Sequence, residues 1–331
     1  MLMVGAVAAA AALLWTGILI SVDSNSTHST TISDAANDAP LSTLAAGSAA
    51  IPDVAAAAGD ATVELRAVTD HGNFTLVGVA VAEGGQVATT AGNLSGLQSI
   101  SMVGAGGQLI QAKLEGIDRS SDIALIEVND DLPVPTFADD VSLAVGNPDM
   151  TLTTSLASDG SVALHCTPGT VTGIGNAITT GTATGMPGIS SSPANVAETD
   201  GDLLLNASGA VLGISYNGNG STPTFLPTQL VLGVADDLRS NGKVSRGWLG
   251  IDGSDATGQS GVEVAKVLPG SPAAGHLSAG DVIGDLNSVP IRTMADLKAR
   301  LYVLAPSTPV TLSVHEGAAS HVVGLTLSSS P

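Results

Sequence analysis

The sequence predicts a mainly β protein, in which a large β domain is followed by a smaller one. From Ala61 onward, short runs rich in β-branched residues alternate with Gly, Asn and Asp, and several runs show a period of two. Such runs over about 180 residues are typical of a β-sandwich or barrel. Glycine is frequent, at 40 of 331 residues, and aromatics make up only 2%, so aliphatic side chains must fill the cores.

An apolar segment covers residues 1–22, which hold no charged side chain. Its length suits a helix that crosses a bilayer, and Trp15 lies toward one end. A cleaved signal peptide is the alternative, but the basic n-region of such peptides is missing. We therefore expect a single transmembrane anchor at 1–22. Residues 23–58 are rich in Ser, Thr, Ala and Asp without periodicity, which predicts a flexible tether.

The large domain is expected at 59–242, with one helix near its end at Leu230 to Arg239. The turn residues Asn241-Gly242-Lys243 mark a boundary, and a second domain follows at 246–328. Its best helix is predicted at Met294–Leu304, with Thr293 as the N-cap. Leu297, Leu301 and Leu304 have the spacing of one buried helix face.

The charge and cysteine content exclude some classes of function. The formal net charge of -20 opposes binding to phosphate backbones, so we expect no nucleic-acid partner. Cys166 is the only cysteine, so no disulfide forms within the chain, and we expect it to be a small buried hydrophobe, not a nucleophile. No cofactor is expected.

Four segments of the large domain carry a family resemblance. They are the hairpin Leu76–Leu94, the stretch Asp118–Val128, the strand Gly169–Ile174 and the stretch Glu198–Ile214. In this order they resemble the HtrA-like (DegP/DegS-type) branch of the trypsin-fold serine proteases. The resemblance implies a trypsin-like double β-barrel at 59–242.

The second domain resembles the PDZ domain of the same family. The matching segments are Arg246–Ile251, Gly270–Ala274, Leu277–Ile283 and Met294–Leu297. In that family the loop before the first peptide-binding strand offers backbone N–H groups to a peptide C-terminus, and the peptide adds as a strand. The resemblance implies peptide-binding positions at Arg246, Trp248, Leu249, Gly250, Ile251, Met294 and Lys298. Core packing is the alternative role for Trp248 and Leu249.

The sequence departs from the family at the catalytic positions. The histidine position corresponds to Gly92, the aspartate to Asp122 and the serine to Asp200. Glycine cannot accept a proton, and an aspartate cannot form the acyl ester that serine forms. In the former oxyanion region, Glu198 replaces a glycine and Gly201 remains. The pattern therefore predicts that no catalytic triad is intact, and that the chain is not an enzyme.

Two further interpretations stay open. A displaced triad could use His71 or His165 with Ser190, Ser191 or Ser192. Alternatively, Glu198, Asp200 and Asp202 alternate along the chain and are weak candidates for binding Ca²⁺ or Mg²⁺, although no calcium-loop motif is present.

Taken together, the residues predict a membrane-tethered pseudoprotease of a bacterial cell envelope, with its folded domains outside the cytoplasm. We expect it to bind peptide C-termini or unfolded segments through the PDZ domain, and a homo-oligomer is one option. The first alternative is an active trypsin-like serine endopeptidase with a displaced triad, acting in envelope protein quality control. The second is an acidic-cluster metal-binding protein.

Overall fold

The computed structural model describes residues 51–104, 106–138, 142–192, 200–216, 222–317 and 319–329. The predicted transmembrane segment 1–22 and most of the predicted tether lie outside these residues. No helix in the described part of the chain combines the length and the apolar character that a membrane span requires.

The C-terminal end of the predicted tether is helical, which corrects the boundary at 58. Helix α2 covers Ile51–Gly59. Val54 and Ala58 on this helix are buried in the largest hydrophobic cluster of the protein. Alanine is common in flexible linkers and is also a strong helix former. Here the helix forms, and its small side chains pack against the hydrophobic core.

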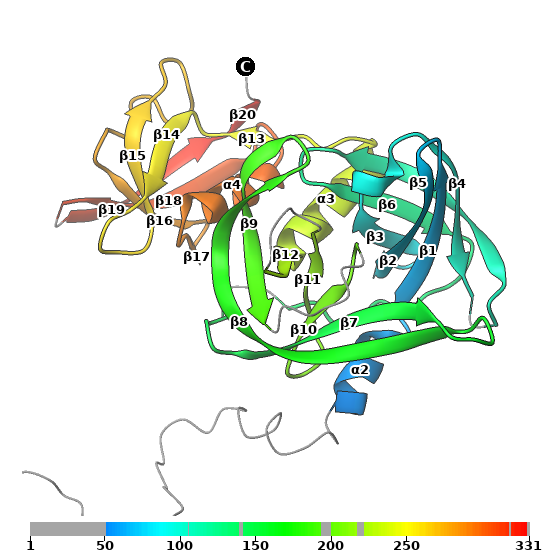
Figure 1. Cartoon of the computed structure of the whole chain (residues 1–331). Coiled ribbons are helices and arrows are strands. Elements are labelled where there is room, and N and C mark those ends of the chain that lie inside the picture. The colour runs from blue at the N-terminus through cyan, green and yellow to red at the C-terminus, as the bar shows by residue number, and fades with distance from the viewer. Residues whose placement is uncertain are drawn as a thin grey trace, which may run out of the picture. The chain divides into compact units, whose positions relative to one another are not determined.

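The first part of the large domain is a closed barrel in the order β1-β2-β3-β6-β5-β4 (Figure 1). All of its neighbouring strands run antiparallel. Its strands are β1 (Thr62–Thr69), β2 (Gly72–Ala82), β3 (Gln86–Thr90), β4 (Leu97–Val103), β5 (Leu109–Asp118) and β6 (Ile123–Val128). A short 3-10 helix, η1 (Gly92–Leu94), connects β3 to β4.

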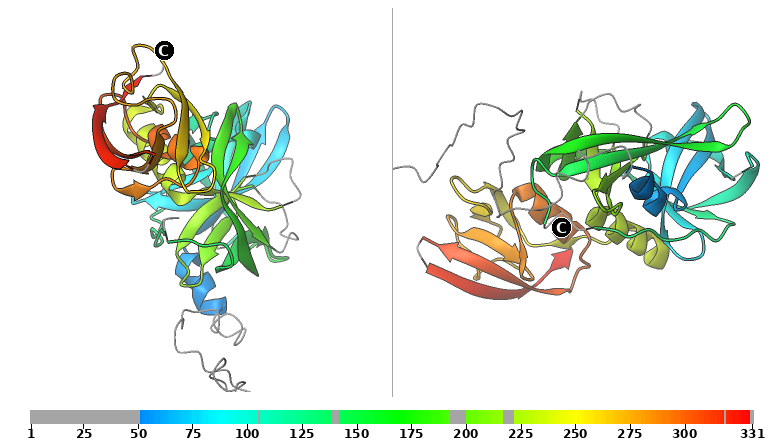
Figure 2. Two further views of the ribbon diagram at one scale, coloured as in Figure 1. Left: turned by 90° about the vertical axis from the view of Figure 1, so that its left-hand side faces the viewer. Right: turned by 90° about the horizontal axis from the view of Figure 1, so that it is seen from below.

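The second part is another closed barrel, in the order β10-β11-β12-β9-β8-β7. Figure 2 shows both barrels from two further directions. Its strands are β7 (Pro148–Leu156), β8 (Val162–Thr180), β9 (Ala183–Ser192), β10 (Leu203–Asn206), β11 (Val211–Ser215) and β12 (Thr224–Pro227). Two closed six-stranded barrels confirm the predicted trypsin-like fold.

Helix α3 (Thr228–Asn241) follows the second barrel and includes the predicted helix. Its buried Leu230, Val234 and Leu238 belong to the same cluster as Val79 of β2 and Leu226 of β12. Because this cluster draws residues from both barrels, it fixes one barrel against the other. Removal of a single large side chain from such a core costs roughly 2–5 kcal/mol.

The second domain has the predicted PDZ character. Its main sheet has the order β14-β15-β16-β18-β19, with β17 on β16, and β13 pairs with β20. Helix α4 (Met294–Tyr302) is capped by Thr293, whose hydroxyl accepts a hydrogen bond from Asp296 N at 3.1 Å. The strands are β13 (Gly247–Trp248), β14 (Ile251–Asp255), β15 (Val262–Val267), β16 (Val282–Leu286), β17 (Val289–Pro290), β18 (Pro309–Glu316), β19 (Ala319–Thr326) and β20 (Ser328–Ser329).

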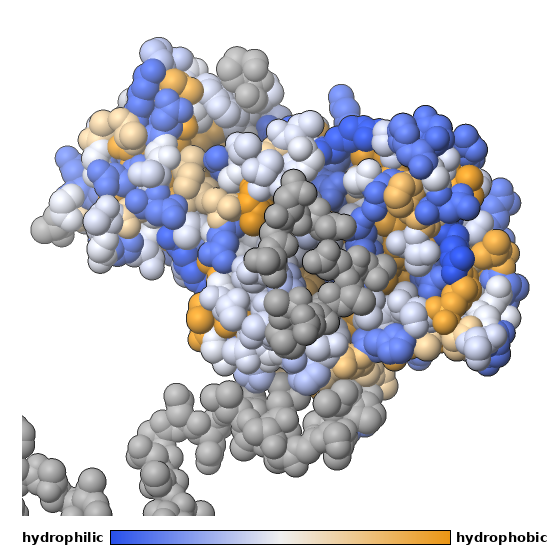
Figure 3. Space-filling view, in the orientation of Figure 1, coloured by the Kyte–Doolittle hydropathy of each residue, from blue (hydrophilic) through white to orange (hydrophobic). Residues whose placement is uncertain are grey.

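On the face shown in Figure 3, hydrophobic residues are interspersed with hydrophilic ones. Aliphatic residues fill the interiors instead, including Leu65, Leu76 and Leu125 in or beside the first barrel, which are 0% exposed. The aliphatic core that the low aromatic content predicted is therefore present.

Candidate functional site

The strand pairing of the first barrel brings positions 92 and 122 together. Strand β3 pairs with β6, and Thr90 is opposite Ile123. The residues just beyond this pair therefore meet: Ala91 N donates to the backbone oxygen of Asp122 at 3.0 Å. A Cβ atom added to Gly92 would lie 3.5 Å from Asp122 Oδ1 and 3.8 Å from Oδ2. Gly92 and Asp122 are thus neighbours, as the family resemblance implies.

Asp122 is a buried carboxyl group with a perturbed protonation equilibrium. Its exposed fraction is 8%, and its φ of 62° is in the left-handed region that non-glycine residues rarely adopt. Burial, and to a lesser extent the charge of Asp200, raise the pKa of Asp122 to about 6, against the opposing effect of the Ala91 and Gly92 amides. Such a combination of desolvation and a like charge is typical of functional carboxyl groups.

Asp200 belongs to the second barrel but contacts the first. Its backbone oxygen accepts a hydrogen bond from Val77 N at 2.8 Å, and Asn93 Nδ2 donates to its Oδ2. It is also 8% exposed. The next residue, Gly201, has φ 92°, and a Cβ there would lie 1.9 Å from Val77 O, so only glycine fits this close approach. These contacts place Asp200 next to Asn93 and within the electric field of Asp122.

Sequence reasoning missed two polar neighbours of this pair, Asn93 and Tyr216. Asn93 directly follows Gly92, so its proximity to the site was foreseeable from the motif. Burial raises the pKa of Tyr216, and the charges of Asp122 and Asp200 raise it further. Its hydroxyl donates to Thr179 O. No sequence motif indicated Tyr216. It directly follows β11, and only the fold of the second barrel brings it near the two aspartates.

The predicted members of a displaced triad do not meet one another. His71 lies in the turn between β1 and β2, with Nε2 3.2 Å from Asp70 Oδ1. His165 of β8 instead contacts Ser155 of β7, with 2.7 Å between Nε2 and Oγ, and both residues are exposed. This is the one serine–histidine hydrogen bond within the described ranges.

Ser190 and Ser191 lie on β9 and have other partners. Ser190 Oγ accepts a hydrogen bond from Asn176 Nδ2 at 3.0 Å. Ser191 Oγ donates to Asp149 Oδ1 at 2.8 Å. Asp149 is 0% exposed, and burial raises its pKa to about 6, although the Ser191 hydroxyl acts in the opposite direction. Ser191 therefore supports a buried acid and does not contact a histidine.

The described residues do not form the acidic metal site that the sequence offered as an alternative. They contain no group of three or more His, Cys, Asp or Glu side chains that could hold an ion. Asp202 is 1% exposed, and its backbone oxygen accepts from Ser215 N at 2.6 Å. Glu198 lies outside the described residues. Cys166 is half-buried, packs against the largest core cluster, and has a pKa raised by burial.

The loop before β14, where peptide-binding positions are predicted, has a tightly constrained backbone. Gly250 has φ 83°, and a Cβ there would lie 2.0 Å from Ser271 Cβ. Leu249 O and Gly250 O accept hydrogen bonds from Ala273 N and Leu268 N at 3.1 and 2.9 Å. The loop is therefore fixed by its carbonyl groups. Strand β14, which contains Ile251, pairs with β15 as its one partner among the described strands.

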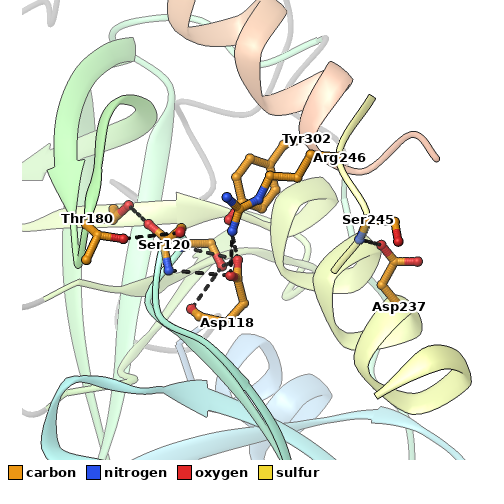
Figure 4. Close-up of polar contacts among 9 residues, drawn as sticks. Asp118, Ser120, Thr180, Asp237, Ser245, Arg246 and Tyr302 are labelled. Carbon is orange, nitrogen blue, oxygen red and sulfur yellow. Dashed lines mark hydrogen bonds and ion pairs between the residues drawn. The ribbon is translucent and has the colours of Figure 1, made fainter. Parts of the chain in front are cut away.

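Several predicted ligand-binding side chains of the PDZ domain have contacts of their own. Arg246 Nη2 binds Asp118 Oδ1 at 2.8 Å, and its guanidinium lies 4.5 Å from the centre of the Tyr302 ring (Figure 4). Lys298 Nζ donates to Thr184 O at 3.4 Å. Met294 packs against the PDZ core, and its backbone N–H donates to Asp255 Oδ1 at 2.7 Å. The roles of these residues in peptide binding stay predictions.

Asp118 is the centre of this cluster, and sequence reasoning gave it no structural role. It is 7% exposed and accepts hydrogen bonds from Ser121 Oγ at 2.7 Å and from the Tyr302 hydroxyl. In Figure 4, Arg246 and Tyr302 both point toward it. Thr180 Oγ1 donates to Ser120 O at 2.6 Å in the same loop. The loop that ends at Asp122 is thus held by the PDZ domain and by β8.

The comparison with protein families identifies a PDZ domain at residues 238–315. A probable periplasmic serine endoprotease DegP-like of Pseudomonas fulva is 34% identical and covers 62% of this chain and 45% of its own length. The periplasmic pH-dependent serine endoprotease DegQ of Escherichia coli is 30% identical and covers 75% of this chain and 58% of its own. The chain therefore spans about half the length of the curated relatives it matches.

Solved structures agree on the fold. The HtrA-type protease AlgW with a tripeptide matches with a TM-score of 0.60 and 21% identity, over 85% of this chain and 97% of that one. A serine endoprotease from Yersinia pestis matches with a TM-score of 0.52 and 20% identity.

The relatives correct two predictions from the sequence. They are named serine endoproteases, which contradicts the predicted pseudoprotease function and the prediction that the chain is not an enzyme. The prediction depended on the residue types at the motif positions, namely Gly92, Asp200 and Glu198 of the former oxyanion region. Side chains outside a family motif can also perform hydrolysis, so the loss of two motif residues does not exclude activity.

Proposed function

Because the chain belongs to the HtrA/DegP-type serine protease family with a PDZ domain, we propose that it is an endopeptidase that cleaves protein substrates in the cell envelope. The observation that carries this proposal is the pair of closed six-stranded barrels joined to a PDZ domain. The relatives from Pseudomonas fulva and Escherichia coli are named periplasmic serine endoproteases, which supports an envelope location for this chain.

The chemistry at position 200 limits how this endopeptidase works. An aspartate there does not form the acyl ester of a serine protease. Hydrolysis must therefore use a serine elsewhere or a water molecule. The contact between Ser155 Oγ and His165 Nε2 at 2.7 Å favours a displaced serine as one candidate, since a nucleophile needs a base within hydrogen-bond reach. Both side chains are exposed, so reagents can reach them.

The first experiment tests hydrolysis and separates these routes. The full chain is incubated with unfolded casein at several pH values, with and without a fluorescent fluorophosphonate, beside an active HtrA-type protease. We expect casein cleavage by this chain. Labelling of Ser155, lost in Ser155→Ala and retained in Ser161→Ala, would identify the displaced serine. Absence of cleavage at every pH, with the control protease active, would refute the endopeptidase proposal.

The PDZ domain is a peptide- or protein-binding module, and we propose that it binds the free C-terminus of the substrate. The fixed loop at Gly250 and the available edge of β14 support this proposal. Fluorescence anisotropy with a C-terminally free peptide and its amidated form tests it. Equal affinity for both forms would contradict recognition of the carboxylate.

A further inference from the structure

We propose that the hydroxyl group of Ser271 donates a hydrogen bond to the terminal carboxylate of a peptide bound to the PDZ domain. The N–H groups of Leu249 and Gly250 complete this carboxylate site. The inference rests on the proposed recognition of a free C-terminus and adds a side chain that recognises it. Ser271 belongs to the segment Gly270–Ala274, for which the sequence pattern indicated no binding role.

Ser271 is a buried polar residue whose side chain lacks a hydrogen bond. It is 7% exposed, and its Oγ has no hydrogen-bond partner among the described residues. A buried hydroxyl group without a partner destabilises a protein, so native structures keep few of them. A ligand that brings an acceptor removes this penalty. Rotation about χ1 lets a serine turn its hydroxyl toward such an acceptor while the backbone stays in place.

The backbone holds Ser271 directly against the loop before β14. On one side of Ser271 in the sequence, Leu268 N donates to Gly250 O at 2.9 Å. On the other side, Ala273 N donates to Leu249 O at 3.1 Å. A Cβ added to Gly250 would lie 2.0 Å from Ser271 Cβ and 2.7 Å from Ser271 Oγ. The unpartnered hydroxyl group therefore lies beside the loop where the peptide terminus is proposed to bind.

The same loop provides backbone donors. The N–H groups of Leu249 and Gly250 form no backbone hydrogen bonds within the described ranges, whereas their carbonyl oxygens are hydrogen-bonded. An ionised carboxylate only accepts hydrogen bonds, and its two oxygens can take several donors at once. Backbone N–H groups are a recurring means of capturing a peptide C-terminus. Two backbone donors and one hydroxyl group thus match the needs of this ligand.

The two cations predicted for the groove contact the barrel domain instead. Arg246 Nη2 binds Asp118 Oδ1 at 2.8 Å, and Lys298 Nζ donates to Thr184 O at 3.4 Å. A peptide carboxylate at Gly250 is therefore met by neutral donors. A hydrogen bond from a neutral donor to an ionised acceptor is stronger than one between two neutral groups, so a single hydroxyl can contribute measurably to affinity.

The first test measures binding to the full chain by fluorescence anisotropy. A library of labelled decapeptides that differ in their last four residues is screened, and the tightest binder is compared with its C-terminal amide. We expect the wild type to bind the free acid at least about tenfold more tightly than the amide. Ser271→Ala should weaken binding of the free acid about tenfold, as expected for one hydrogen bond to a charged group, and leave binding of the amide unchanged. Ser278→Ala, at an exposed serine of the same domain, is the matched control.

Thermal unfolding without peptide separates a binding role from a structural one. Because the Ser271 hydroxyl has no partner in the structure, Ser271→Ala should leave the unfolding midpoint unchanged or raise it. Circular dichroism follows the transition for both serine variants and the wild type. A lower midpoint for Ser271→Ala than for Ser278→Ala would show that the hydroxyl supports the fold, and would overturn the inference.

The remaining outcomes distinguish this inference from the proposed peptide recognition. Undiminished affinity of Ser271→Ala for the free acid, while the wild type still prefers the acid to the amide, would overturn the role of Ser271 and leave carboxylate recognition intact. Equal affinity of the wild type for both forms, or a library without any binder, would overturn both.

Discussion

Replacement of Asp149 by asparagine should raise the free energy of unfolding at pH 7 and lower it at pH 4, where the wild-type carboxyl group is already protonated. Asp149 is 0% exposed, and its pKa rises from 3.8 to about 6 because of burial. A group with a raised pKa in the folded state contributes stability that is fully present below its unfolded pKa. This contribution is lost as pH rises through the folded pKa, so the relevant window is pH 3.8 to about 6.

The magnitude follows from the size of the shift. A rise of roughly 2 pKa units corresponds to at most about 3 kcal/mol of lost stability at pH 7. Asparagine removes the charge and can still accept the Ser191 hydroxyl at Oδ1. Its amide would occupy the place of Asp149 Oδ2, which has no hydrogen-bond partner among the described residues. A buried amide without a partner costs about 1–3 kcal/mol, so we expect a net gain of about 1 kcal/mol at pH 7.

Urea unfolding followed by far-UV circular dichroism at pH 4, 5, 6, 7 and 8 measures this effect. The quantity to compare is the difference in unfolding free energy between Asp149→Asn and the wild type. The unfolding free energy of the variant should increase relative to that of the wild type as the pH rises from 4 to 7. Asp131→Asn, at an exposed position, is the control for removal of one negative charge. A difference that is constant across this range, or one that favours the wild type at pH 7, would refute the argument.

Three further substitutions test other contacts. Tyr302→Phe removes the hydrogen bond to buried Asp118 and should cost about 1–3 kcal/mol of unfolding free energy, measured by urea unfolding; an unchanged value would show that the contact is dispensable. Thr293→Ala removes the cap of α4 and should cost about 1 kcal/mol, whereas Thr293→Ser should retain most of it; equal losses in both would contradict capping by the hydroxyl. Gly250→Ala forces a side chain toward Ser271 at φ 83° and should abolish binding of a C-terminal peptide in an anisotropy assay, while retained affinity would contradict the proposed loop.

The fold was predictable from local patterns and motif order. Period-two runs marked the strands, and the family resemblance, which rests on the order of the motifs, implied that positions 92, 122 and 200 lie in one region. The Thr293 cap followed from a residue type that favours N-caps. These features depend on short segments or on a known family arrangement, and both are visible in a single sequence.

Contacts between distant segments were not predictable in the same way. Arg246 and Asp118 are 128 residues apart, and Arg246 was expected at a peptide carboxylate instead. Ser155 meets His165 only because the register of β7 and β8 places Thr153 opposite His165. The raised pKa of Asp122 requires burial together with a second carboxyl group from the other barrel, and neither condition is written in the local sequence.

The free edges of the PDZ sheet have a consequence for solution behaviour. Both barrels are closed, whereas β14 and β19 each pair with one neighbour among the described strands. An edge strand is a template for pairing with another chain, so β14 can also attract a second copy of the protein. The net charge of -20 keeps copies apart at low ionic strength, and salt screens this repulsion. Concentrated samples should therefore remain dispersed longest in dilute buffer, and a short peptide that covers β14 should delay turbidity when salt is added.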